Sequence, residues 1–119
     1  MSTTAENIAN AILTNDPLTA RSLVQDWLRS APVFANEPPP GTVDVRTRAV
    51  AAAIVELLAE RAGQSAPSWT AAEGRLASPL FLVDAAQHSP KLRARVERES
   101  PAPLRKRNVF APASYLEQR

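Results

Sequence analysis

The stretch DVRTRAVAAAIVELLAERAG, residues 44–63, decides the fold of this chain. Its larger apolar side chains recur every three to four positions, which is the spacing of one face of an α-helix. That face is predicted to consist of Val50, Ala53, Ile54, Leu57 and Leu58. Asp44 or Thr42 is expected to cap the helix, and Gly63 is expected to end it. The small side chains at 49–53 would let a second helix approach closely.

Two shorter helices are expected before this stretch. Asp16-Pro17 is a strong start signal, because Asp accepts hydrogen bonds at the N-cap and Pro fits the first helical position. The helix that follows should end near Ser30, because Pro32 disfavours helical geometry at the residue before it. Apolar residues spaced as in a helix predict a further helix at 3–13.

Residues 31–42, APVFANEPPPGT, are typical of a proline-rich linker with an extended polyproline path. After the central helix, the T-x-x-E pattern of Thr70 and Glu73 predicts a short helix at 70–76. The apolar segment 79–83 is expected to form a helical turn running into residues 84–87, with a short strand as the alternative.

Ser89-Pro90 repeats the start signal of Asp16-Pro17 and predicts a helix over 91–99, which Pro101 and Pro103 would break. An extended piece is expected at 108–111 and a final turn at 113–118. The sequence thus predicts a mainly α fold: a small bundle of four to five helices forming one domain over 1–119. Residues 100–119 are expected to be an extended, proline-containing basic C-terminal arm.

Composition supports a folded chain and excludes several classes of site. Apolar residues make up 45% of the 119 residues and charged residues 22%, an ordinary globular balance. The absence of cysteine excludes disulfides, thiolate nucleophiles and cysteine-based metal sites. No apolar run approaches the roughly 20 residues that span a bilayer, and the N-terminus lacks the pattern of a signal peptide. We therefore expect a cytoplasmic protein that is not associated with a membrane.

Little in the sequence is suited to catalysis. The single histidine, His88, lies just before a helix cap, where an exposed loop position is expected, and no Gly-rich phosphate loop is present. Glu56 and Glu60 form an i,i+4 pair of carboxylates, which we interpret as a solvated helix face. We expect no catalytic residue, no metal site and no cofactor, and therefore not an enzyme.

The charge is distributed unevenly along the chain. Residues 1–90 contain six Lys/Arg and nine Asp/Glu, whereas residues 91–119 contain eight and three. This asymmetry indicates contact between the C-terminal quarter and something anionic, either nucleic acid or an acidic protein groove. The alternative is internal pairing with Glu97, Glu99 and the acidic first ninety residues. The candidate cationic contacts are Lys91, Arg93, Arg95, Arg98, Arg105, Lys106 and Arg107.

Aromatic residues are few and fall into two groups. Trp27 and Trp69 lie where a helix face and a helix lead-in need apolar bulk, so both are interpreted as core residues. Phe110 and Tyr115 lie in the polar, proline-flanked tail. They are candidate anchors that dock into a partner or onto the protein's own surface.

Three segments resemble a family of small bacterial proteins that are encoded in two-gene operons. They are LTARSLVQDWL at 18–28, APSWT at 66–70 and ESPAPLRKRNVFAP at 99–112, of which the last is the most specific. Proteins of this family are antitoxins paired with nucleotidyltransferase-type toxins. The resemblance implies a cognate protein toxin as partner, neutralised by direct binding, and it carries over no catalytic residue.

Two alternatives remain open from the sequence. One is a nucleic-acid-binding transcriptional regulator that contacts DNA through the basic segment and represses its own operon. The other is a homo-oligomeric module, such as a homodimer in which residues 49–53 pack against a second copy. Neither a helix-turn-helix nor an RNA-binding signature accompanies the basic segment.

Overall fold

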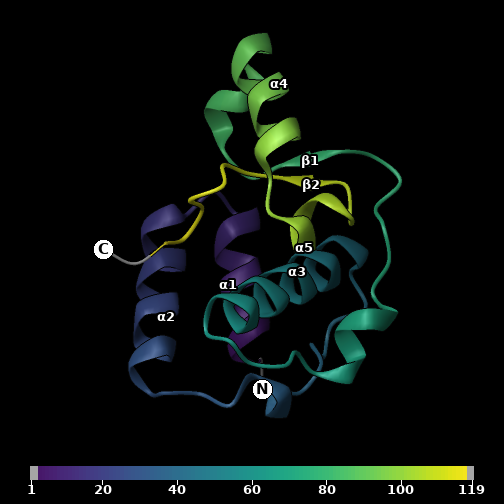
Figure 1. Cartoon of the computed structure of the whole chain (residues 1–119). Helices are drawn as coiled ribbons and strands as arrows, with labels where there is room; N and C mark the ends of the chain where they lie inside the picture. The colour runs from purple at the N-terminus through teal and green to yellow at the C-terminus, as the bar shows by residue number, and fades with distance from the viewer. Residues whose placement is uncertain (1–2, 118–119) are drawn as a thin grey trace.

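Helix α3 (Val45–Arg61) runs through the middle of the molecule (Figure 1). The structure, a computed structural model, describes residues 3–117, the side chain of residue 87 apart. Asp44 caps α3, because its carboxylate accepts hydrogen bonds from the backbone N–H and the hydroxyl of Thr47 at 2.9 and 2.7 Å. Gly63 follows the helix with a φ of 68°, a conformation that glycine adopts without strain. The expected start and end of this helix are confirmed.

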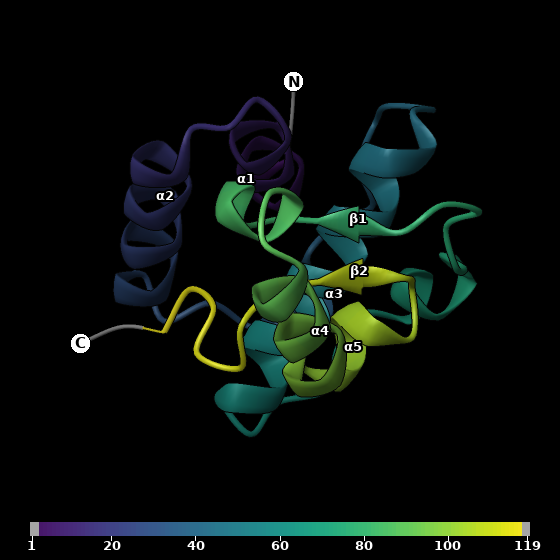
Figure 2. The ribbon, with the colours of Figure 1, turned by 90° about the horizontal axis from the view of Figure 1, so that it is seen from above.

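Helices α1 (Thr4–Leu13) and α2 (Pro17–Arg29) form an antiparallel pair at one side of α3 (Figures 1 and 2). Asp16 caps α2 as expected, its carboxylate accepting from the N–H of Thr19 at 3.2 Å. α1 lies between α2 and α3 and contacts both helices. The helices expected at 3–13 and from Pro17 to near Ser30 are thus present.

Residues 31–42 connect α2 to α3 mainly without regular structure, and they pack against the body of the protein. The segment contains a 3-10 turn, η1 (Phe34–Asn36), whose Phe34 is buried and meets Trp27 edge-on with ring centroids 4.9 Å apart. The backbone carbonyl of Glu37 accepts a hydrogen bond from the Trp69 indole at 2.8 Å, and its carboxylate accepts from the N–H of Ala5. These contacts tie the proline-rich segment to the body of the protein.

The second half of the chain alternates short elements. They are η2 (Ser68–Ala72), β1 (Leu80–Phe81), η3 (Asp84–Gln87), α4 (Pro90–Glu99), α5 (Ala102–Arg105) and β2 (Val109–Phe110). β1 and β2 pair in parallel, with Leu80 opposite Val109 and Phe81 opposite Phe110. The mainly α fold of four to five helices is confirmed, because five α-helices and this one small sheet account for the regular structure of residues 3–117, 3-10 turns aside.

Two local expectations are corrected here. The T-x-x-E pattern does not cap a helix at 70–76, because the Thr70 hydroxyl donates to the carbonyl of Pro67 and Glu73 instead binds Arg48 with contacts of 2.6 and 2.8 Å. At 79–83 the strand alternative holds, since pairing with β2 supplies hydrogen-bond partners that a helical turn would lack.

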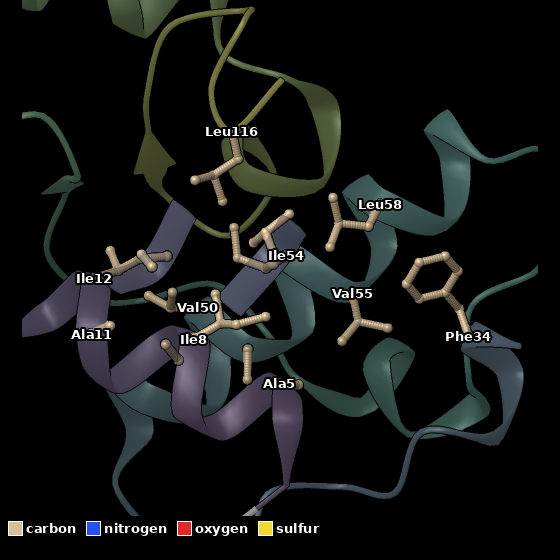
Figure 3. Close-up of a cluster of buried hydrophobic side chains, with 14 of the residues drawn as sticks. Ala5, Ile8, Ala11, Ile12, Phe34, Val50, Ile54, Val55, Leu58 and Leu116 are labelled. Carbon is tan, nitrogen blue, oxygen red and sulfur yellow. The ribbon is translucent and has the colours of Figure 1, made fainter. Parts of the chain in front are cut away.

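The core surrounds α3 on several sides (Figure 3). Val50, Ile54 and Leu58 pack against α1 and its neighbours, while Ala49, Ala53 and Leu57 pack in a second cluster with Leu104, Val109 and Ala111. Residues 49–53 are at most 2% exposed. This small-residue face is therefore covered within the chain, because α1 and α5 pack closely against the alanines.

The C-terminal segment is not an extended arm. Within the described part of 100–119, the side chains of Leu104, Val109, Ala111 and Leu116 are buried, and α5 interrupts the extended path. β2 lies within the extended piece expected at 108–111. The apolar residues between the basic ones cover α3, which explains why the segment folds onto the body. Residues 118 and 119 lie outside the described residues.

Candidate partner-binding surface

Helix α4 stands off the rest of the molecule (Figure 1). Ser89 caps it, accepting a hydrogen bond from the N–H of Leu92 at 3.3 Å, and Pro90 occupies its first position. Val96 is the one buried residue of the helix. α4 is therefore held by few apolar contacts and exposes most of its surface.

Three of the predicted cationic residues share one face of α4. Lys91, Arg95 and Arg98 are spaced i, i+4 and i+7, so they follow each other along the helix, and all three are exposed. Arg105 of α5 extends this row, because its guanidinium donates a hydrogen bond to the carbonyl of Arg98 at 3.1 Å. We call these four side chains the cationic stripe.

The cationic stripe is poorly neutralised from within the chain. Arg95 pairs with Glu99 at 3.0 Å, and both side chains are largely open to solvent. Lys91 and Arg98 form no hydrogen bond or ion pair through their side chains in the part of the chain that the structure describes. Like charges at i,i+4 destabilise a helix, and a cation near its N-terminus opposes the helix dipole. Lys91 thus lowers the stability of α4, whereas Arg98 lies in the last turn, where a cation suits the helix dipole.

Arg93 lies on a different face of α4, against the small sheet. Its guanidinium carbon is 5.1 Å from the centre of the Phe81 ring, a cation–π distance. The Phe81 ring packs in turn on Phe110, with centroids 5.3 Å apart. Phe110, a predicted anchor, is therefore half-buried against the protein's own sheet and not on a free tail.

Arg107, a predicted partner contact, is buried inside the protein. Its side chain is 2% exposed, and its guanidinium donates to both carboxylate oxygens of Glu56 at 2.9 and 2.8 Å. The remaining donors bind the carbonyls of Glu73, Pro103 and Thr70. A buried cation needs this complete set of partners, because an unpaired one carries a large desolvation cost.

Lys106 is exposed, but its ammonium also pairs with Glu56, at 2.7 Å. The run of three basic residues at 105–107 is thus split between surface and interior. Internal pairing of these cations, an alternative that the sequence left open, occurs for Lys106 and Arg107 with a carboxylate of the first ninety residues. It does not occur for Arg105.

Glu56 is the residue that sequence reasoning misplaced. It was interpreted as part of a solvated face, yet its side chain is only 12% exposed. Burial alone would raise its pKa, but hydrogen bonds from Arg107 and Lys106 outweigh that effect and lower the pKa to about 2. A signal was available, because Glu56 lies between Val55 and Leu57 of the apolar run, where a carboxylate needs a partner.

Tyr115 packs against the body of the protein. Burial raises the pKa of its phenol to about 12, and its backbone carbonyl accepts a hydrogen bond from Arg61 at 2.7 Å. It packs beside both core clusters. Of the two outcomes that the sequence left open for this aromatic residue, docking onto the protein's own surface is the one observed.

Among residues 3–117, no three His, Cys, Asp or Glu side chains come together as a metal site would require, and no helix has the length and apolar character needed to cross a bilayer. His88 is exposed at the end of η3.

Comparison with known proteins returned no family model, no curated protein and no solved structure that matches this chain.

Proposed function

We propose that this protein is a non-catalytic antitoxin that neutralises a nucleotidyltransferase-type toxin by direct binding, with the cationic stripe as its main contact. The observation that carries the proposal is the row of Lys91, Arg95, Arg98 and Arg105 on a helix that stands off the body. Lys91 of the stripe lowers the stability of the free protein, and an anionic partner would relieve its repulsion.

The partner's chemistry fits this surface. A toxin that binds a nucleoside triphosphate with its metal ion carries carboxylates in an open cleft. A helix that projects from a compact body can enter such a cleft, and arginine binds carboxylates with two parallel hydrogen bonds. The contact set is narrower than the sequence suggested, because Arg107 and Tyr115 are held inside the protein.

Co-expression with the protein encoded by the adjoining gene tests the proposal. The parent chain should restore growth that the neighbouring protein arrests. The double variant Lys91→Glu/Arg98→Glu should lose at least about tenfold in affinity for that protein, which corresponds to about 1.4 kcal/mol. It should also fail to restore growth.

The matched control is Arg29→Glu/Arg75→Glu, which changes the net charge equally at exposed sites off α4. It should protect as well as the parent. Equal protection by both double variants would refute the role of the cationic stripe. A neighbouring protein that neither arrests growth nor binds this chain would refute the antitoxin proposal itself.

A DNA-binding regulator is a second candidate, because the same exposed arginines can bind phosphates. If the protein neutralises about three phosphates, the logarithm of its association constant for DNA should fall with the logarithm of the salt concentration at a slope near −3. Fluorescence anisotropy with duplex DNA from the operon promoter, measured from low to physiological salt, distinguishes the candidates. Tight, salt-steep binding that Lys91→Glu/Arg98→Glu abolishes, together with no effect on the neighbouring protein, would favour the regulator.

A further inference from the structure

The small sheet has one unpaired edge. β2 lies along only one side of β1 (Figure 2), and no other strand is present among residues 3–117. The N–H groups of Leu80 and Leu82 donate to β2, to the carbonyls of Asn108 and Phe110, each at 3.0 Å. Because N–H directions alternate along a strand, those of Phe81 and Val83 point to the opposite edge. Val83 is extended, with φ −106° and ψ 117°.

Two hollows that share the lining residues Arg46 and Leu80 lie beside this edge, and together we call them the groove. One, of about 150 Å³, is lined by the end of α1 at Ile12 and Leu13 and by residues 80–82. The other, of about 420 Å³, is lined by residues 76–80. Both hollows share Arg46, which lies in the first turn of α3. The open backbone groups thus lie beside two depressions that share a cation, of which the one lined by residues 76–80 is mainly apolar and the other mainly polar.

Within the described residues, Arg46 acts through its charge, which favours the ionised carboxylate of the neighbouring Asp44. Its side chain is exposed and makes no hydrogen bond or close ion pair within the described range. The neighbouring carboxylate of Asp44 is engaged in capping through Thr47. A cation in the first turn also opposes the dipole of α3. Its charge is therefore available to a carboxylate that enters the groove.

We propose that the open edge of β1 binds an extended segment of a partner protein by strand addition, and that this segment carries an acidic side chain for Arg46. Same-face side chains of a strand are almost 7 Å apart. An apolar side chain at that spacing from the acidic one would lie over the hollow lined by residues 76–80, which is the more apolar of the two. The groove therefore favours an acidic residue with an apolar residue two positions away.

The register of the added strand is fixed by charge. Asp84 closes the hollow that contains Ile12 and Leu13, so an acidic side chain placed there would be repelled. Pro79 has no N–H to offer, which confines the backbone donors of this edge to Phe81 and Val83. This surface is separate from the cationic stripe, and the inference does not depend on what the stripe binds.

Two synthetic peptides test the proposal by NMR on the uniformly ¹⁵N-labelled full chain. One has the sequence Ser-Val-Thr-Glu-Thr-Leu-Ser, and the other has Lys in place of Glu. The acidic peptide should shift the amide signals of Phe81 and Val83 and slow their hydrogen exchange. It should bind about fivefold more tightly than the Lys peptide, as expected for a partly exposed ion pair.

Arg46→Glu should reverse this preference, and it should fold, because a carboxylate suits the first turn of a helix. Arg29→Glu, on the far side of the body, should keep the preference of the parent. No shift at Phe81 and Val83 with about 5 mM of either peptide would overturn the proposal. So would shifts confined to α4, or a preference that Arg46→Glu leaves unchanged.

Discussion

Removing the carboxylate of Glu56 tests how the second half of the chain is attached to the first. In Glu56→Ala, the Arg107 guanidinium keeps its carbonyl partners but loses its counter-charge while only 2% exposed. Breaking a buried ion pair from one side costs about 3–5 kcal/mol. A domain of this size has a total free energy of unfolding of about 5–15 kcal/mol. The variant is therefore expected to lose a large part of its stability.

Urea unfolding followed by tryptophan fluorescence measures this loss, because Trp69 adjoins Thr70, whose carbonyl accepts a hydrogen bond from Arg107. Glu60→Ala is the matched control. It removes the same group one turn along α3 from an exposed position and should change stability by less than about 0.5 kcal/mol.

A double variant separates the ion pair from simple loss of packing. Glu56→Leu/Arg107→Met replaces both charges by apolar groups, and it should be more stable than Glu56→Ala because no unpaired charge stays buried. A loss below about 1 kcal/mol in Glu56→Ala would refute the reasoning. A double variant less stable than Glu56→Ala would point to the carbonyl contacts of Arg107 and not to its charge.

Three further outcomes are expected. Because the pKa of Glu56 is lowered to about 2 by folding, its stabilising effect should be complete above about pH 5 and decline as the pH falls from there toward 2, which denaturant midpoints across that range would show. Lys91→Glu should increase the free energy of unfolding by about 0.5 kcal/mol, because it relieves repulsion at the start of α4, and a slightly higher thermal midpoint would show this. The same variant should bind the partner more weakly. Ala53→Leu should cost about 1–3 kcal/mol in urea unfolding, because Ala53 is fully buried where helices meet.

The helices were predictable because their signals are local. Asp16, Asp44 and Ser89 each accept a hydrogen bond from an N–H three residues later, and this geometry depends on the adjoining sequence alone. The same holds for the apolar face of α3, whose spacing shows in the sequence. The cations of α4 are exposed, because that helix buries only Val96 and has few tertiary contacts.

The sequence by itself determined the mainly helical fold, the ends of its principal helices and the excess of positive charge near the C-terminus. Only the tertiary structure decided which of those charges face solvent. Arg105 and Arg107 are two residues apart in a basic run, yet one lies at the surface and the other binds Glu56 from 51 residues away. The pairing of β1 with β2, and the open edge it leaves, was decided in the same way. Such contacts depend on where distant segments meet in space, and the local propensities that a sequence displays do not specify that meeting.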